Sequence, residues 1–327
     1  MKEGLIFANA AVKAREENLF SGDRLARMLE ADALQDAVKI LIEAGYGGGT
    51  VPEDPSDFES ILSAEAAITE KFIDGIAPEG AGFECFRLQA DYHNMKALVK
   101  ARYTSDGEEG ALRAGGLIDI DLLKEKLGRE NPDINPFADE ALAEIAKAAA
   151  DGKPSPRKVD TAFDRAMFKD IAARLRARSA PEELKEYFRV YADCLNLASF
   201  VRTLGIGGNF AFFEDVYMEG GSISAEDFEK AFQEGVSAVA VLAKRTPLAT
   251  YADALAAGDV TGFEVARDDY LLGIFRKNKA EMFSVAPVMG YYLAKQNEIR
   301  VLRIALVCIK NGVDKQEIRK KLRELYA

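Results

Sequence analysis

A short pattern recurs at nearly constant intervals along this chain of 327 residues, each time inside a long segment with helical periodicity. An acidic residue is followed eight positions later by Val or Leu, and the position three after the acid is Asn in two of the three copies. The acids are Asp91, Asp193, which lies 102 residues further on, and Glu298, which lies 207 residues beyond the first. A fixed period of this size predicts a fold that uses one helical unit several times.

The segments that open the predicted units also align. Residues 115–123 match residues 220–228 at a constant offset of 105, and residues 21–25 carry a shorter version of the same pattern. Ser21 and Ser224 stand where an N-cap belongs, so that each side chain would accept a hydrogen bond from a first-turn amide. These alignments predict an opening helix at the start of each unit.

The offsets divide the chain into three predicted units, residues 1–116, 117–221 and 222–327. Each unit is expected to hold an opening helix, a middle helix and the long helix that carries the acid. Chance similarity between helical sequences is the alternative, and the constant offset across several elements argues against it. The middle helices are predicted at 57–72, 159–175 and 263–278.

Helical periodicity extends over nearly the whole chain. Apolar residues recur at three- and four-residue spacing, whereas sustained alternation of Val, Ile and Thr is hard to find. With 48% hydrophobic and 30% charged residues, the chain has enough apolar content to build a packed core. The predicted fold class is therefore all-α. Connections rich in Gly, Pro, Asp or Asn are expected at 46–57, 103–116, 128–136, 151–157 and 205–222.

Charge and hydropathy argue against two classes of partner. The 43 basic and 54 acidic residues give a net charge of −11 without a stripe of Lys and Arg, so nucleic acid is not expected to bind. The longest apolar runs, such as 236–243, fall short of the roughly 20 residues of a membrane-spanning helix. Charged residues follow the apolar run 5–12 at once, which indicates an amphipathic helix of the mature protein rather than a signal peptide.

Residues suited to catalysis are scarce. His93 is the only histidine, so a Ser/His/Asp or Cys/His arrangement has one candidate base at most. The glycine clusters at 45–49 and 205–208 lack the Lys and Ser/Thr of a phosphate-binding loop, and glycine-rich helix ends explain them. The three cysteines are scattered in apolar helical patterns and fit reduced cytoplasmic thiols. No catalytic residue, cofactor or metal is predicted.

The three repeated acids allow two interpretations. Asp91, Asp193 and Glu298 would bind a cation if they converged on the axis of a threefold array. They would instead hold the fold together if each made hydrogen bonds to a neighbouring helix. The second interpretation is favoured because an acid followed three residues later by Asn is a natural polar contact between helices. The acids are therefore predicted to be structural.

Two asparagines belong to the same predicted contact. Asn94 and Asn196 follow their acids by three residues, so acid and amide lie on one helix face. Val301 takes the equivalent position in the third copy. A buried acid also needs a partner, and Lys96 and Arg303 are the candidates.

Four strings of residues resemble one protein family. They are FANAAVKAR at 7–15, the helix end at 41–48 with its Tyr-Gly turn, RLQADYHNMKAL at 87–98 and KQNEIRVLRI at 295–304. Together they resemble the C subunits of the V/A-type rotary ATPases, the family that also includes the eukaryotic d (AC39) subunits. The resemblance extends from near residue 5 to the last predicted helix, although Ala198 and Val301 depart from the family pattern.

The resemblance implies a function in coupling rather than in catalysis. A funnel-shaped array of three helical units would sit on the cytoplasmic face of the ion-carrying membrane ring, as a peripheral component. Its hollow would receive the tip of the central shaft, and rotation would pass between shaft and ring during proton or sodium transport or ATP synthesis. The implied partners are the central-shaft subunits and the proteolipid subunits of the ring. No cofactor is implied.

Contacts with such partners are expected at Gly/Pro-rich junctions, because loops at unit ends recur on one side of a repeat array. An aromatic cluster in the last junction would be either an interface anchor or local core. An acid-lined, metal-dependent helical enzyme and a generic helical adaptor are the alternative functions, and neither accounts for the strings at both chain ends. The junctions are 46–57, 128–136 and 205–222, and the aromatic cluster is Phe210, Phe212 and Phe213.

Overall fold

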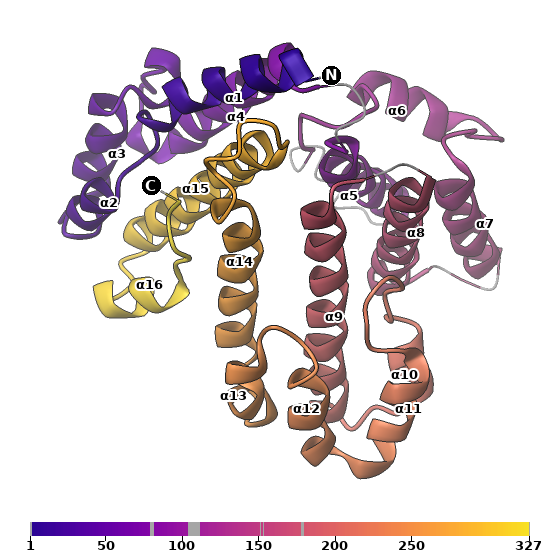
Figure 1. Cartoon of the computed structure of the whole chain (residues 1–327). Coiled ribbons are helices and arrows are strands. Elements are labelled where there is room, and N and C mark those ends of the chain that lie inside the picture. The colour runs from indigo at the N-terminus through magenta and orange to yellow at the C-terminus, as the bar shows by residue number, and fades with distance from the viewer. Residues whose placement is uncertain are drawn as a thin grey trace. The chain divides into compact units, whose positions relative to one another are not determined.

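The computed structural model of this chain contains only helices, turns and loops in the part that it describes (Figure 1). The sixteen α-helices found there, and the absence of strands among the same residues, confirm the predicted all-α class. None of these helices combines the length and the apolar character needed to cross a membrane. The described residues are 2–78, 82–103, 112–150, 152, 154–177 and 180–326.

The helices pack into two compact bodies. The central body is the continuous stretch Gly82–Phe263, and the terminal body joins the two ends of the chain, Met1–Ala81 and Glu264–Ala327. The predicted threefold division groups the chain by sequence similarity rather than by packing, and it stays a prediction. Parts of the predicted connections 103–116 and 151–157 lie outside the described residues.

The central body is built around two long helices that carry repeated acids. Its helices are α5 (Glu84–Tyr103), α6 (Ile120–Gly128), α7 (Pro136–Ala150), α8 (Pro156–Ala177), α9 (Glu182–Gly205), α10 (Phe210–Glu214), α11 (Ala225–Glu234), α12 (Val236–Ala243) and α13 (Ala252–Ala256). Helix α8 packs against both α5 and α7, while α10, α12 and α13 pack against α9. Phe200 of α9 lies in an aromatic core, with ring centroids 5.5 Å from Phe228 and 4.6 Å from Phe232.

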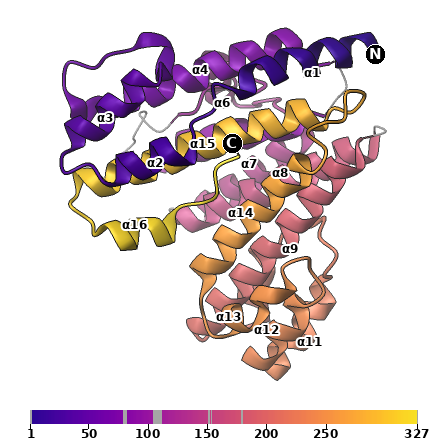
Figure 2. The same cartoon turned by 60° about the vertical axis from the view of Figure 1, so that its left-hand side comes forward.

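The terminal body is organised around its longest helix (Figure 2). Its helices are α1 (Lys2–Glu16), α2 (Gly22–Leu29), α3 (Leu34–Glu43), α4 (Phe58–Ile76), α14 (Val260–Arg276, from residue 264 on), α15 (Ala286–Lys310) and α16 (Lys315–Lys321). Helix α15 packs against α1, α2, α3, α4 and α16. Phe20, Leu41, Ile61 and Leu302 meet in a shared apolar core, so residues from both ends of the chain are needed to build it.

The opening helices begin where the sequence places them. Ser21 accepts a hydrogen bond from the Arg24 amide at the start of α2. Ser224 accepts one from the Asp227 amide at the start of α11, and the Asp227 carboxylate accepts one from the Ser224 amide in return. Asp119 caps α6 with its own side chain. Both predicted serine caps are confirmed, and each satisfies an amide that the helix itself leaves unpaired.

The middle helices and the glycine turns also follow the prediction. Helices α4, α8 and α14 cover the three expected segments, with ends displaced by a few residues. The cluster at 45–49 ends α3 and forms a tight 3-10 turn in which Gly47 has φ of 70°. A side chain at Gly47 would also overlap the backbone of Ile61, so the turn and its packing both require glycine.

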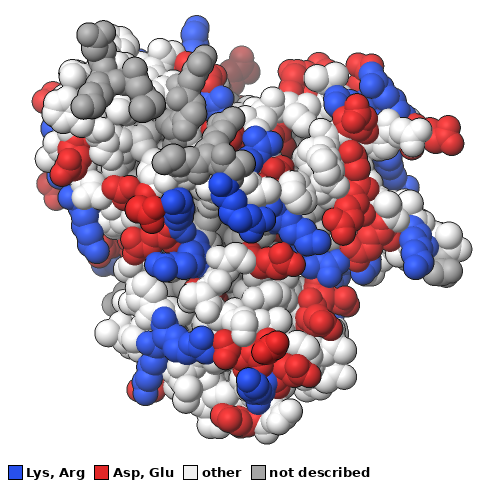
Figure 3. All heavy atoms as spheres, turned by 45° about the vertical axis from the view of Figure 1, so that its right-hand side comes forward, with Lys and Arg blue, Asp and Glu red and all other residues white. Residues whose placement is uncertain are grey.

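Basic and acidic side chains are interspersed on the face shown in Figure 3. Ion pairs between such side chains are numerous among the described residues, such as Arg165 with Glu144 at 2.8 Å. This distribution agrees with the mixture of basic and acidic residues along the sequence. Cys85, Cys194 and Cys308 are free thiols.

Candidate functional site

The first repeated acid holds the segment that leads into an opening helix. Asp91 of α5 is 1% exposed, and its carboxylate accepts hydrogen bonds from the amides of Leu117 at 2.9 Å and Ile118 at 3.1 Å. These amides lie directly before Asp119, the N-cap of α6. Burial raises the pKa of Asp91 above its usual value, and the two amide hydrogen bonds oppose that shift. The carboxylate therefore fixes the path of the chain into α6.

The second acid makes the same contact in the same body. Asp193 of α9 accepts hydrogen bonds from the amides of Ser222 at 2.7 Å and Ile223 at 3.0 Å, directly before α11. The Ser222 hydroxyl donates a further hydrogen bond to the other carboxylate oxygen at 2.6 Å. The Asp193 contact thus repeats the Asp91 contact and adds a hydroxyl donor.

A glycine allows each of these close approaches. At Gly116 and at Gly221, a Cβ atom would overlap the carboxylates of Asp91 and Asp193, respectively. Each glycine stands two residues before the second amide of its contact. Any side chain there would push the acid away from the amides that donate to it, so the aspartate and the glycine form one structural unit.

The repeated asparagines bind the backbone of the same connections, a few residues before the amides that the acids accept from. The Asn94 side chain donates to the carbonyl of Arg113 and accepts from its amide, both at 2.8 Å. Asn196 does the same with Met218, again at 2.8 Å in both directions. Both asparagines are fully buried. The predicted polar contact is present, but its partner is the backbone before the opening helix and not a neighbouring helix.

The third acid lies in the terminal body. Glu298 of α15 is 2% exposed, and one carboxylate oxygen accepts from the amide of Phe20 at 2.7 Å. Phe20 directly precedes Ser21, the N-cap of α2. As in the other two contacts, a buried acid accepts from an amide immediately before an opening helix. Here the acid and the amide are 278 residues apart in the sequence.

A buried lysine distinguishes the Glu298 contact. Lys295 lies 2.8 Å from Glu298 and 2.7 Å from Glu65, and its ammonium group also sits 4.8 Å from the centroid of the Tyr46 ring. Glu65 accepts from the amide of Gly47 at 2.9 Å. Burial raises the pKa of Glu298 and Lys295 opposes that shift, while the two acids raise the pKa of Lys295 against the effect of its burial. Sequence analysis missed this pair, although the i, i+3 spacing of lysine and glutamate was a signal for it.

The predicted charge partners of the acids bind elsewhere. Lys96 pairs with Asp164 at 2.6 Å, and Arg303 pairs with Glu59 at 2.8 Å. Backbone amides donate to the three acids instead, because the connections before the opening helices carry N–H groups that the helices leave unpaired. Among the described residues, no three His, Cys, Asp or Glu side chains lie close enough together to hold a metal ion. His93 lies half-buried on α5.

The three phenylalanines of the last junction differ in their surroundings. Phe213 is fully buried, with ring centroids 4.8 Å from Phe228 and 5.9 Å from Phe200. Phe210 is half-buried against the same core. Phe212 is also half-buried, with the Arg157 guanidinium 3.4 Å from the centroid of its ring. Phe213 therefore belongs to the local core, and the interface role of the cluster stays a prediction.

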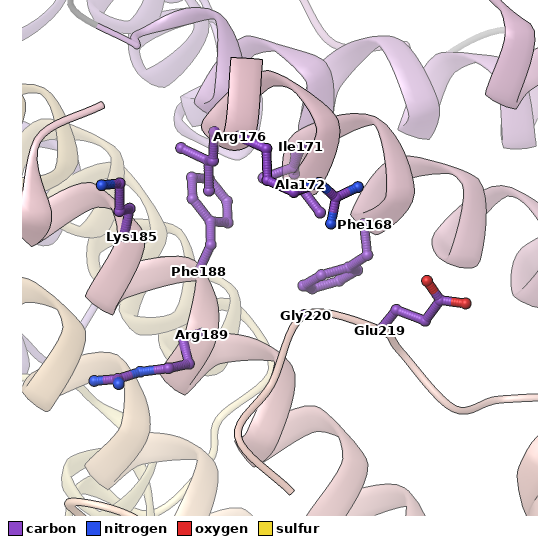
Figure 4. Close-up of a pocket in the computed structure, with 10 residues that line it drawn as sticks. Phe168, Ile171, Ala172, Arg176, Lys185, Phe188, Arg189, Glu219 and Gly220 are labelled. Atoms are coloured by element: carbon purple, nitrogen blue, oxygen red, sulfur yellow. The ribbon is translucent and has the colours of Figure 1, made fainter. Parts of the chain in front are cut away.

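The central body also contains an apolar pocket that the sequence did not indicate (Figure 4). It has a volume of about 440 Å³ and lies between α8, α9 and the turn at residues 219–220. The rings of Phe168 and Phe188 face this space. Three separate segments contribute to the lining, and no local pattern brings them together.

Comparison with known proteins assigns the chain to a family. A family model described as ATP synthase (C/AC39) subunit matches residues 8–321. The chain belongs to this family. It is 21% identical to the C subunit of the V-type sodium ATPase of Enterococcus hirae, over 97% of this chain and 98% of the relative.

Other C/AC39 relatives match over similar lengths. The C subunit of the A-type ATP synthase of Thermococcus gammatolerans is 25% identical over 98% of this chain and 90% of its own length. The C subunit of the V-type ATP synthase of Thermus thermophilus is 22% identical over 94% of both chains. The chain is therefore a non-catalytic part of a V/A-type rotary ATPase, in complex with other ATPase subunits.

Proposed function

We propose that this C/AC39 protein joins the central shaft of a rotary ATPase to the ion-carrying membrane ring and transmits torque between them. The observation that carries this proposal is the family match, which extends over nearly the whole chain, from residue 8 to residue 321. Torque would serve ion transport or ATP synthesis without any bond being made or broken in this protein. The chain would lie at the cytoplasmic face of the membrane, held there through the complex.

A torque-transmitting part must resist deformation, and the buried contacts support this requirement. Each repeated acid fixes a connection to the helix that follows it, so bending at that connection would leave buried amides unpaired. Close-packed aromatic and aliphatic cores fill the space between helices in both bodies. Both features favour stiff bodies over hinged ones.

Three contacts of one kind support the proposed three-unit array. Asp91 and Asp193 hold the openings of the second and third units, and Glu298 of the last long helix holds the opening of the first. The same kind of contact thus links each proposed unit to the opening of another. We propose that the funnel implied by the family resemblance is built from these three units, and that the Gly/Pro-rich junctions include its partner contacts.

Reconstitution tests the coupling role. The complex would be purified with and without this protein, and ATP hydrolysis and ion uptake into vesicles would be measured on both. Without it, ATP hydrolysis by the soluble sector should continue while ion uptake is lost, and adding the purified chain should restore uptake. Full ion uptake in its verified absence would refute the proposal. Denatured chain added at the same concentration serves as the control.

A further inference from the structure

The apolar pocket of the central body has the form of a groove for a helix side chain. Its floor is made by Phe168 and Ile171 of α8 and Phe188 of α9, each less than 5% exposed. Two packed helices form its walls, and Gly220 lies at its third side (Figure 4). Grooves between helices that are lined in this way commonly receive a bulky apolar side chain from an amphipathic helix.

Cations without partners stand at the mouth of this pocket. Arg176 and Arg189 are both exposed and line it, and within the described part of the chain neither forms an ion pair. Lys185 lies beside them and pairs with Glu182, one turn away. The chain as a whole carries 54 acids against 43 bases, so counter-charges are abundant elsewhere. At the pocket itself, three basic residues, Arg176, Lys185 and Arg189, face a single acid, Glu219. This local excess of positive charge favours a partner that brings carboxylates.

The turn on one side of the pocket is anchored to α9. Gly220 is followed by Gly221 and Ser222, whose path is fixed by the hydrogen bonds to Asp193. The wall on this side is therefore anchored to α9, which also supplies Phe188 and Arg189. A wall that is ordered before binding lowers the entropic cost of association.

We propose that this pocket docks an acidic amphipathic helix of the central shaft. The helix places an aromatic or large aliphatic side chain between Phe168 and Phe188, and its carboxylates pair with Arg176 and Arg189. Aromatic side chains and arginine are enriched at protein interfaces relative to the rest of the surface. The inference rests on the proposed coupling function, because that function supplies the shaft as a partner.

Two variants test the pocket through its charge and through its shape. Arg176→Glu/Arg189→Glu reverses the charge at the mouth, and Ala172→Phe fills the apolar space while leaving charge unchanged. The probe is the purified complex of shaft proteins from the same ATPase, titrated against the full chain by biolayer interferometry. We expect each variant to weaken shaft binding at least tenfold, about 1.4 kcal/mol. Detergent-solubilised ring should bind both variants as it binds the unmodified chain.

A matched control separates this site from general charge effects. Lys147→Glu/Lys230→Glu makes the same change in net charge at two lysines of the central body that do not line the pocket. It should bind the shaft like the unmodified chain. Thermal unfolding shows whether each variant is folded.

The outcomes discriminate between the two proposals. Unchanged shaft affinity of the folded Arg176→Glu/Arg189→Glu variant overturns the pocket proposal alone, as does a loss that affects only ring binding or appears equally in the control. If the unmodified chain binds neither shaft nor ring, the coupling function fails and the pocket proposal fails with it.

Discussion

In both the central and the terminal body, a buried acid accepts a hydrogen bond from the backbone before an opening helix, but the surrounding residues differ. In the central body, a short aspartate reaches the connection because Gly116 or Gly221 lets the backbone come close. In the terminal body, the acid is Glu298, and Asn18 stands two residues before Phe20, where the other contacts have glycine. Glutamate is one methylene longer than aspartate. The contact without a glycine therefore has the longer acid, and the two contacts with a glycine have the shorter one.

The two bodies also differ in how the buried charge is balanced. The Asp91 and Asp193 carboxylates accept hydrogen bonds from the backbone. Glu298 shares the ammonium group of Lys295 with Glu65, and a valine replaces the asparagine three residues further on. The terminal contact thus relies on a buried ion pair, which is sensitive to loss of either partner. The comparison predicts which substitutions each body tolerates.

The largest expected effect is at Glu298. Glu298→Ala leaves a buried amide at Phe20 without its acceptor and removes one of two charges that face Lys295. We expect a loss of about 3 kcal/mol in the free energy of unfolding, against about 2 kcal/mol for Asp91→Ala, which strands only amides. Urea unfolding gives the totals, and hydrogen exchange assigns each loss to its body. A larger loss for Asp91→Ala would contradict the comparison.

The glycines should be the next most sensitive positions. Gly116→Ala and Gly221→Ala each force a methyl group against a buried carboxylate, with an expected cost of about 1–3 kcal/mol. Asn18→Ala, at the equivalent place in the terminal body, should change stability by less than about 0.5 kcal/mol. The measurement is the urea midpoint of each variant. Equal costs at all three positions would show that glutamate does not replace the glycine requirement.

A smaller effect separates the two aspartate contacts. Ser222→Ala removes the hydroxyl that donates to Asp193, and we expect a loss of about 1 kcal/mol. Leu117→Ala, at the matching position of the Asp91 contact, removes an exposed side chain and serves as the control. Thermal unfolding of both variants provides the measurement. A neutral Ser222→Ala would mean that the two amides alone account for the Asp193 contact.

The smallest effect concerns pH. Because burial raises the pKa of Asp91 above its usual value of 3.8, the folded chain keeps this proton to higher pH than the unfolded chain does. Ionisation of Asp91 therefore removes stability as pH rises from 3.8 through the raised pKa. The stability of the unmodified chain minus that of Asp91→Asn should fall across this window and level off above it. Urea unfolding at stepped pH measures it, and a difference that increases with pH would contradict the raised pKa.

Much of the fold could be predicted because its signals are local. The serine caps at Ser21 and Ser224 and the helical periodicity depend on neighbours within a few residues. The nearly constant offsets identified one recurring set of acids and asparagines, and every member of it is buried. The members are Asp91, Asn94, Asp193, Asn196 and Glu298.

The partners of these residues could not be predicted in the same way. Periodicity shows which side of a helix is buried, but it does not show which backbone amide meets it. Charge alone favours Lys96 and Arg303 as partners. The backbone amides before the opening helices have no hydrogen-bond acceptor of their own, and they donate to the acids instead. The apolar pocket needed Phe168, Phe188 and Gly220 to meet from three segments, which only the packed structure reveals.

The split of the terminal body has a consequence for synthesis on the ribosome. The central body is one continuous stretch, so all of its residues are available once residue 263 has emerged. Phe20, Met28 and Leu41 emerge before their packing partners Leu302 and Glu298, and Glu298 follows Phe20 by 278 residues. During elongation these helices therefore expose apolar surface until α15 has been made. In a nascent chain, this surface is where we expect chaperones to bind.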